Sequence, residues 1–562
     1  MALLDHQPPS VFEDTLRLAE VPSNLNATRE SSGSRSLEQG LRIIPLRLRG
    51  FTRLFIFGSL IYMTFAFGGV HAANYLSFQA LLFGLLAVYL MMCPTALYNG
   101  VVAPLKIGGT SRSPNGPVLS RSIAVFLAGL CIYPALQLAL FSLRREAHPV
   151  LGFATAPLDR AAFFEQWITL VAFAAWFILL SSFVKDSPRR ARIMFRVLAL
   201  LTFAVSITAL MHWFYDNGKL FWVFAPDYMF LSNRARWPFV NSNHLAHFLL
   251  PGIFILTGWL TINAQEIGRQ IKDAASRDRR KFSNLIISSE LQSRVIASAF
   301  LFAALGAALL CLFSSLSRGG WFGAAGGGIA LLWLSAARRG EQDAGEPQQT
   351  LHLKRSKHHR QSGSRSSHGA DALLGVLSRS RMVVKPLIVL MLCTFIYLFF
   401  NERGSDLFAE RLDYGLLHSK DDMRWVMFAD SLRMFWDHPV LGVGLGGWAT
   451  SYPLYMERLL SGINPVYLHS DPLQLLCETG ILGGLLMLGL VASVLAGVWR
   501  ALPRVQDNLR IKLVSLASGL IALSIASFFD FSFHIPAIAL SAGAYLALTA
   551  FYVERAWLTK LR

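Results

Sequence analysis

The stretch HSDPLQLLCETGILGG places His469 directly before the predicted start of a helix. Asp471, Pro472 and Gln474 fit the N-cap, N1 and N3 positions of a capping box, so a helix should begin there and continue into an apolar span. Free N–H groups at a helix N-terminus attract phosphate oxygens. An imidazole beside them can accept a proton from an attacking hydroxyl group. His469 is therefore a candidate general base, although most loop histidines have no catalytic role.

Two arginines near the ends of predicted membrane spans could bind an anion. Arg236 lies in RWPFVNSNH, at the mouth of a span, and Arg318 lies in the very short SRGG turn between two spans. A guanidinium at membrane depth is costly unless it pairs with an anionic group, and it can hold a phosphate through two hydrogen bonds. For Arg318 the alternative is a structural ion pair or a position at the membrane interface.

The elements that must position these residues are predicted to be membrane helices. Of the 562 residues, 54% are hydrophobic and only 15% are charged, which is unusual for a soluble protein of this length. Apolar runs of about 17 to 22 residues recur along the chain, each long enough to cross a hydrocarbon core of roughly 30 Å as a helix. We predict an all-α polytopic protein with about twelve spans, approximately at residues 54–70, 77–97, 122–140, 165–184, 197–213, 245–263, 295–316, 320–335, 386–400, 481–499, 513–529 and 536–552.

The charges indicate how these spans are oriented. The first fifty residues are polar and contain no apolar stretch typical of a signal peptide, so we expect the N-terminus to stay in the cytoplasm. Twelve crossings then return the C-terminus to the cytoplasm. On this topology roughly 39 of the 52 Lys and Arg residues fall in cytoplasmic segments, as the positive-inside rule requires. The basic clusters lie beside spans and lack interleaved aromatic residues, which argues against nucleic-acid binding.

The predicted segments follow from this topology. They are a disordered cytoplasmic tail at 1–50, spans 1–8 within 51–335, a disordered basic cytoplasmic loop at 336–385, span 9 at 386–400, a periplasmic loop at 401–480, spans 10–12 within 481–552 and a cytoplasmic tail at 553–562. The 401–480 loop is far longer than a helix–helix connection needs, which indicates function. Within it, residues 421–437 fit a surface amphipathic helix with Trp425 and Trp436 at the membrane interface, and the glycines between 442 and 447 permit an irregular path.

No cofactor is predicted. The five cysteines lie in or at the ends of apolar spans without metal-ligand spacing, and there is no Walker loop or dinucleotide fingerprint. The histidines between 352 and 368 occur among Ser, Gln and Gly residues, which is typical of a disordered loop rather than a metal site.

With these residues the chain resembles the O-antigen ligase and polymerase superfamily of bacterial membrane enzymes. The ligase motif of that family is His, then Asn, Ser or Gln, nine residues, Gly, two residues, and Gly, Thr or Tyr; His469, Ser470, Gly480 and Gly483 fit it. The stretches RWPFVNSNHLAHF, SRGG, MRWVMFADSLRMFWDHPVLGVGLGGW and Asp530 with FSFHIP resemble further blocks in the same order. The sequence departs from the family in having HSDPL where many members have HN, and in its longer cytoplasmic loop.

The resemblance implies a GT-C-like, inverting, metal-independent glycosyltransferase that takes a glycan from undecaprenyl diphosphate on the periplasmic face of the cell inner membrane. It implies that His469 activates the acceptor hydroxyl, and that Arg318, Arg236 and Arg424 hold the donor diphosphate. The acceptor of a ligase is the lipid A core, which we favour. A polymerase of O-antigen, capsule or exopolysaccharide would instead use a second lipid-linked glycan, and a close variant would glycosylate a protein. A flippase for lipid-linked oligosaccharide is the non-enzymatic alternative, although flippases more often carry internal repeats and polar midplane helices.

Overall fold

The computed structural model describes residues 46–92, 118–143, 159–185, 187–215, 217–225, 234–277, 288–337, 423–456, 465–505 and 507–558. All of them belong to one compact unit, Leu46–Arg562. Within these ranges the secondary structure is helical and contains no β-strand, so the predicted all-α fold is confirmed.

Nine helices in the described ranges are long and apolar enough to cross a membrane. They are α3 (Ala72–Met92), α5 (Leu119–Leu143), α6 (Arg160–Lys185), α7 (Pro188–Phe214), α8 (Ser242–Arg277), α10 (Ser289–Ser314), α18 (Asp471–Ala501), α19 (Asp507–Ala526) and α20 (Pro536–Leu558). Two further apolar helices are α2 (Leu46–Phe65) and α11 (Arg318–Ala336). Every predicted span overlaps one of these helices except 386–400, which lies outside the described residues. The fold is therefore a polytopic membrane fold, and the count of twelve stays a prediction.

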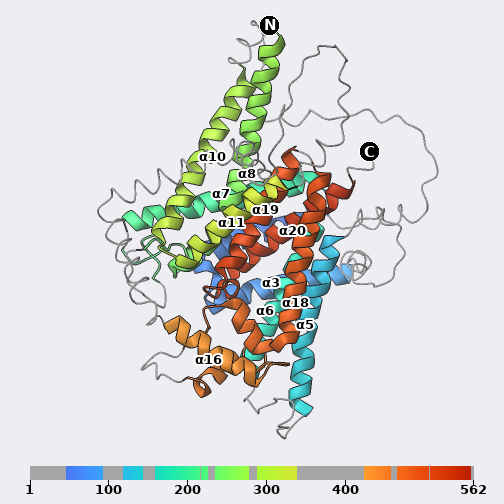
Figure 1. The fold of residues 1–562 in the computed structure, drawn as a ribbon, viewed down its shortest axis with the longest axis vertical. Helices are drawn as coiled ribbons and strands as arrows, with labels where there is room; N and C mark the ends of the chain where they lie inside the picture. Colours follow the sequence, from blue (N-terminus) through green and yellow to red (C-terminus); the bar gives the residue numbers. More distant parts are fainter. Residues whose placement is uncertain are drawn as a thin grey trace, which may run out of the picture. The chain divides into compact units, whose positions relative to one another are not determined.

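Helices α8, α19 and α20 form the centre of the helix packing. In the 18-residue apolar windows of α20 and α8, 89% and 83% of the residues are buried, against 22% in the window of α3. A helix that is apolar on all sides must be covered by other helices or by lipid, so α3 presents most of its surface to lipid while α8 and α20 do not. Figure 1 shows α18 running beside α5, and α8 and α10 running side by side beyond the other helices at one end.

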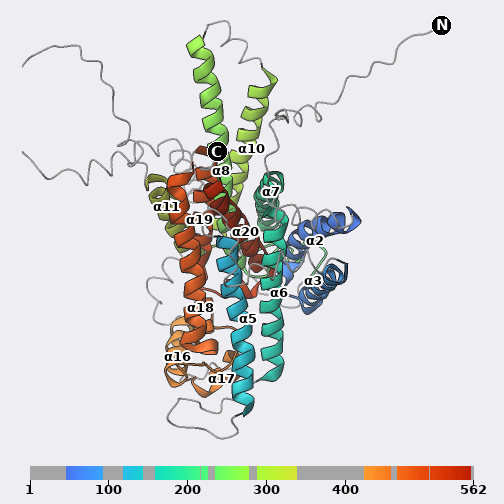
Figure 2. The ribbon, with the colours of Figure 1, turned by 90° about the vertical axis from the view of Figure 1, so that its right-hand side faces the viewer.

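The described part of the long 401–480 segment contains α16 (Met423–Asp437), α17 (Trp448–Ser451) and the 3-10 turn η7 (Tyr452–Leu454). Helix α16 confirms the predicted amphipathic helix, since Met427 and Met434 are buried whereas Trp425 and Trp436 are 56% and 71% exposed. In Figures 1 and 2, α16 lies beside the end of α18 that carries its N-terminus.

A kink in α18 explains the first of the two glycines in the ligase motif. Gly480 interrupts the helix with φ 62° and ψ −166°. There the turn from Pro439 to Gly444 runs against the helix: the Ile481 N–H donates to the Pro439 carbonyl, and the Val443 N–H donates to the Cys477 carbonyl. A Cβ on Gly480 would overlap the Val440 carbonyl oxygen. Only glycine fits this close backbone approach at a positive φ.

Candidate functional site

A cavity of about 1540 Å³ lies where the ends of several membrane helices meet the loops that join them. Its polar wall contains His469 together with Arg234, Arg236, Asn243 and Arg424. The remaining walls are mostly aliphatic side chains of α18, α19 and α20. Residues that are widely separated in the sequence thus share one cavity that combines cationic groups with apolar surface.

His469 points its imidazole at a buried carboxylate. Its Nδ1 lies 2.9 Å from Oδ1 of Asp530, a residue in the connector between α19 and α20. The backbone of His469 has a φ of 59°, in the left-handed region that costs a residue with a side chain about 1 kcal/mol or more. The ring is 29% exposed, whereas the carboxylate is fully buried. The backbone strain at His469 is therefore held in place by the packing that joins the ring to Asp530.

Asp530 is ionised and its oxygens accept several hydrogen bonds. Besides the His469 contact, Oδ2 accepts a 2.7 Å bond from Asn243 and Oδ1 accepts the N–H of Phe531. Burial alone would raise the pKa of the Asp530 carboxyl, but the His469 hydrogen bond and the positive charges around it, including Arg424, hold that pKa well below its usual range. An ionised Asp530 keeps the proton of a neutral His469 on Nδ1, which leaves Nε2 to accept a proton.

A chain of hydrogen bonds fixes this pair to the rest of the protein. Arg234 donates through Nε to the Ser315 carbonyl at 2.6 Å and through a terminal nitrogen to Oδ1 of Asn243 at 3.0 Å. Asn243 in turn donates to Asp530. Four segments are therefore linked at His469: the α10–α11 turn, the start of α8, the α19–α20 connector and the residues before α18.

Two of the three arginines predicted to bind a diphosphate lie in the cavity with His469. Arg236 is 4% exposed and stacks over the Trp237 ring at 4.9 Å. Arg424 donates to the carbonyl of Phe529, the residue before Asp530, at 3.0 Å. Arg318 begins α11, after the N-cap Ser317, and it is not among the residues that line this cavity.

The predicted capping box before α18 is wrong. The helix begins one residue earlier than expected, with Ser470 as its N-cap and no side-chain capping bond. The carboxylate of Asp471 instead bonds to the Phe533 N–H and to Nδ1 of His534, both from the α19–α20 connector. The Gln474 side chain accepts the N–H of Leu468 rather than capping the helix. Asp471 and Gln474 therefore bond to residues outside α18 rather than to the backbone N–H groups of its first turn.

Sequence reasoning missed several residues that this site uses. Arg234 stands two positions before Arg236, and Asp530 was recognised only as part of a sequence block. His244, three residues before His247 on one face of α8, lines the cavity and has its Nε2 3.9 Å from Asp530. His247 is paired with Ser532 at 2.6 Å. The repeated polar residues in NSNHLAHF, at the start of an apolar span, could have indicated these residues. Polar side chains in a membrane span are costly unless they bond to one another or belong to a functional site.

The arrangement provides a base oriented by an ionised carboxylate, with guanidinium groups in the same cavity. Such groups can remove a proton from a hydroxyl and stabilise negative charge on a leaving group. Among the described residues, no group of three or more His, Cys, Asp and Glu side chains could hold a metal ion. The histidines between 352 and 368 lie outside the described residues.

A known protein family matches the part of the chain that contains several of these residues. The family model for O-antigen ligase matches residues 302–488, a range that contains Arg318, Arg424 and His469 but not Arg236 or Asp530. A comparison with curated proteins found no match. The members of this family are glycosyltransferase-like enzymes. The chain therefore carries a domain of the O-antigen ligase family, which confirms the predicted resemblance.

Proposed function

We propose that this protein is a glycosyltransferase that moves a glycan from undecaprenyl diphosphate to an acceptor hydroxyl, with the lipid A core as the favoured acceptor. The reaction would take place on the periplasmic face of the cell inner membrane. The observation that carries the proposal is the hydrogen bond between His469 and the buried, ionised Asp530, in a cavity that Arg236 and Arg424 also line.

In the proposed reaction His469 is the general base. Nε2 takes the proton of the acceptor hydroxyl as its oxygen forms a bond to the anomeric carbon of the donor sugar. The bond from that carbon to the phosphate oxygen breaks, and the electron pair leaves with undecaprenyl diphosphate, so the configuration at the anomeric carbon is inverted. Asp530 stabilises the imidazolium that forms, as a carboxylate beside a catalytic histidine does in other acyl- and group-transfer sites.

The arginines supply the charge that the leaving group requires. A polyprenyl diphosphate gains negative charge on its phosphate oxygens as the glycosidic bond breaks, and guanidinium groups can bind those oxygens in pairs. Arg236 and Arg424 line the cavity that His469 also lines, which supports this role for them. Arg318 remains a candidate from the resemblance. In this scheme arginines, rather than a metal ion, neutralise the diphosphate.

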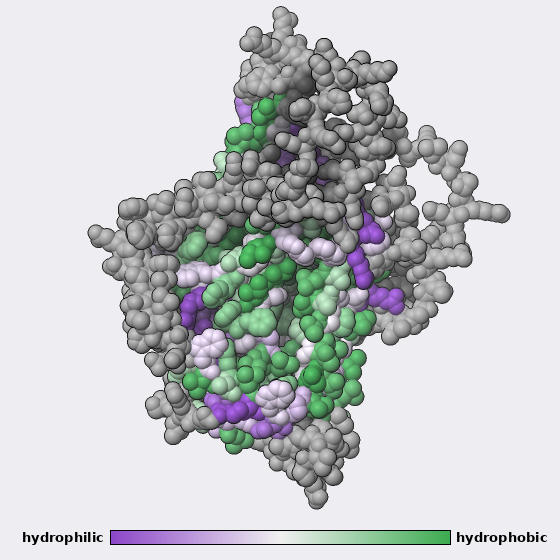
Figure 3. All heavy atoms as spheres, in the orientation of Figure 1, coloured by the Kyte–Doolittle hydropathy of each residue, from purple (hydrophilic) through white to green (hydrophobic). Residues whose placement is uncertain are grey.

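The apolar part of the cavity suits the lipid of the donor. Leu485, Leu488, Val491 and Leu495 repeat at helical spacing along α18, line the cavity and are each about 40% exposed or more. Figure 3 shows that the described surface on one face of the molecule is largely hydrophobic, with hydrophilic residues confined to a few places. A long isoprenoid chain could bind along such a surface while its diphosphate reaches the arginines.

Reconstitution of the purified protein in liposomes tests this function. The donor is a glycan on undecaprenyl diphosphate, and two acceptors are offered in separate reactions: lipid A core oligosaccharide and a second lipid-linked glycan. We expect transfer to the lipid A core, and we expect His469→Ala to lower the transfer rate at least about 10²-fold because proton removal is lost. In the same assay Arg424→Ala should raise the donor KM.

His438→Gln is the matched control, because His438 bonds to Tyr455 and is not among the residues that line the cavity. It should keep transfer near the wild-type rate. Normal product formation by His469→Ala would refute the base assignment. Elongation of the lipid-linked glycan in place of core modification would make the protein a polymerase. Donor movement across the bilayer without a new glycosidic bond would make it a flippase.

A further inference from the structure

The cavity has a second polar region that the proposed chemistry at His469 does not use. A row of aromatic rings leads to it: His469 contacts Phe531 at 4.9 Å between ring centroids, Phe531 stacks on Tyr467 at 4.7 Å, and Tyr467 lies against His534 at 4.5 Å. Three ring contacts thus connect the proposed base to a second histidine, and all four residues line the same cavity.

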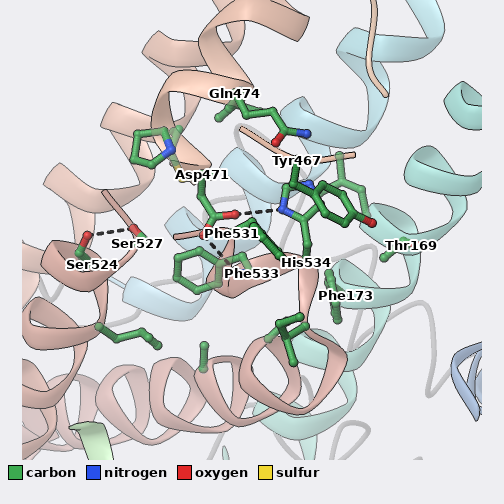
Figure 4. Close-up of a pocket in the computed structure, with 18 of the residues that line it drawn as sticks. Thr169, Phe173, Tyr467, Asp471, Gln474, Ser524, Ser527, Phe531, Phe533 and His534 are labelled. Atoms are coloured by element: carbon green, nitrogen blue, oxygen red, sulfur yellow. Dashed lines mark hydrogen bonds and ion pairs between the residues drawn. The ribbon is translucent and has the colours of Figure 1, made fainter. Parts of the chain in front are cut away.

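His534 is paired with Asp471 in the same way that His469 is paired with Asp530. Its Nδ1 lies 2.9 Å from Oδ1 of Asp471, whose other oxygen accepts the N–H of Phe533. Figure 4 shows this pair beside the Tyr467 ring, with Gln474 above it. Burial by itself would lower the pKa of His534, but the hydrogen bond and charge of Asp471, with the charge of Glu478, raise it above its usual value. The ring therefore tends to carry a proton and to act as a donor.

Helices α3 and α6 complete this region. Tyr75 donates its hydroxyl to Glu165 at 2.7 Å, and the Gln166 side chain is hydrogen-bonded to the hydroxyl of Tyr467. Burial is the main reason that the pKa of Tyr467 is raised, which keeps its hydroxyl protonated. We call Tyr75, Glu165, Gln166, Tyr467 and His534 the second wall. It presents hydroxyl, amide, carboxylate and imidazole groups around the half-buried aromatic ring of Tyr467.

The two polar regions differ in charge. The region around His469 has the guanidinium groups of Arg234, Arg236 and Arg424 against the single carboxylate of Asp530. Around the second wall the cavity is lined by Glu165, Asp471 and Glu478 and by the imidazole of His534, and burial raises the pKa of Asp471 and of Glu478. A second diphosphate would lack a guanidinium partner there, because the three arginines that line the cavity belong to the region around His469. A neutral ligand rich in hydroxyl groups would find hydrogen-bond acceptors, hydrogen-bond donors and an aromatic ring to stack on. In ligand sites such polar groups fix the orientation of the bound molecule.

We propose that the second wall binds a pyranose ring of the acceptor glycan and directs one of its hydroxyl groups to His469. The proposal rests on the proposed transferase function and adds the acceptor subsite to it. In an inverting transfer the attacking oxygen and the leaving phosphate oxygen lie on opposite sides of the anomeric carbon, so the acceptor cannot occupy the arginine region with the diphosphate. The second wall lies outside the arginine region. It is connected to His469 by the ring of Phe531, which contacts both Tyr467 and His469.

Steady-state kinetics in proteoliposomes, with lipid A core oligosaccharide as the acceptor, test this assignment. Glu165→Gln and Tyr467→Leu should each raise the acceptor KM about tenfold, the effect of losing roughly one hydrogen bond or one stacking contact, and should change the donor KM less than twofold. Tyr467→Phe keeps the ring, so its acceptor KM should fall between those of the wild type and Tyr467→Leu. This graded effect would not arise from misfolding, because a folding defect lowers the amount of active enzyme and leaves KM unchanged.

Glu554→Gln is the matched control for Glu165→Gln. Glu554 also accepts a hydroxyl hydrogen bond, from Ser120 at 2.6 Å, but it lies outside the cavity, so this substitution should leave both KM values unchanged. An unchanged acceptor KM in both Glu165→Gln and Tyr467→Leu, or an equal rise in the donor KM, would overturn the acceptor subsite while wild-type transfer upholds the proposed function. Failure of the wild type to glycosylate any acceptor would overturn both.

Discussion

Asp530 is the residue on which the geometry of the site depends. It is fully buried, it accepts hydrogen bonds from His469, Asn243 and the Phe531 N–H, and its pKa is held well below the ordinary value of about 3.9. A carboxylate in this state keeps its charge throughout the pH range in which membrane enzymes are assayed. It can therefore fix the tautomer of His469 without titrating during the reaction.

Replacement of Asp530 by Asn tests this role through activity and through pH. Asp530→Asn should lower transfer about 10³-fold, since the amide no longer holds the proton on Nδ1 of His469. Because the folded-state pKa lies below the unfolded one, the stabilisation by the ionised carboxyl is present above about pH 4 and is lost as the pH falls through the folded-state pKa. The Tm difference between wild type and Asp530→Asn, read from tryptophan fluorescence in detergent, should then be present at neutral pH and shrink as the pH is lowered below about 4. A difference that vanished near neutral pH would contradict this.

At the residue scale, the sequence identified the groups but not their pairing. His469 and Arg236 were recognised from their types and their positions at predicted span ends, and the structure brings them into one cavity. Asp530 lies 61 positions from His469, and no local pattern relates two residues at that separation. The prediction for Asp471 was wrong for the same reason. Its carboxylate has the spacing of a helix cap, but it bonds instead to His534 and to the Phe533 N–H, which are 63 and 62 positions away.

Among the elements, α18 is the one whose shape the site requires. Its kink at Gly480 lets the stretch from Pro439 to Gly444 form backbone hydrogen bonds to the exposed carbonyls of the first helical segment. This segment carries Asp471 and follows directly on His469. The kink therefore couples the outer loop, with α16 and α17, to the start of α18.

Gly480→Ala should be strongly destabilising, by more than about 2 kcal/mol, because the new methyl group overlaps the Val440 carbonyl and the positive φ is unfavourable for alanine. Thermal unfolding of the detergent-solubilised protein measures the loss. Gly84→Ala is a matched control within α3, where a Cβ has no atom within 4 Å, and it should leave the Tm unchanged or raise it through better helix propensity. Equal Tm values for Gly480→Ala and wild type would show that the kink is dispensable.

Element boundaries show which part of the fold hydropathy could predict. The span expected at 245–263 lies within α8, which runs from Ser242 to Arg277. The additional turns are polar, and contacts outside the membrane hold them: Arg269 pairs with Asp507 at 2.7 Å, and Gln270 donates to Glu290 at 3.0 Å. A search for apolar runs detects only the portion of a helix that lipid or core surrounds, so the polar extension could not be seen.

For the whole molecule, the predicted topology requires that the cavity and α16 face the periplasm and that the projecting ends of α8 and α10 face the cytoplasm. Figure 2 agrees with this requirement, since α16 and α17 lie at the end of the helix bundle opposite to the projecting ends of α8 and α10. Most of the polar residues that line the cavity come from the N-terminal ends of α3, α6, α8 and α18, from the loop before α8 and from the α19–α20 connector. The predicted alternation of spans puts these segments on one face of the membrane.

Labelling of single cysteines in intact cells measures which face this is. In a variant whose five native cysteines are replaced, Trp436→Cys on α16 should react with a membrane-impermeant maleimide that reaches the periplasm, because residue 436 is 71% exposed. Glu290→Cys, near the start of α10 with its side chain 67% exposed, should react only after the inner membrane is permeabilised. The reverse pattern would place the cavity in the cytoplasm and exclude the proposed donor.

The position of Asp530 between α19 and α20, the two most C-terminal helices of the described residues, has a consequence for biosynthesis. Ribosomes deliver His469 and all three candidate arginines to the membrane before the carboxylate that orients the imidazole has been translated. A nascent chain released before Ser527 would possess every charged group of the donor region and still lack a competent base. If His469 is the base that we propose, activity therefore requires the insertion of α19 and α20, and a chain that ends before Asp530 should be inactive.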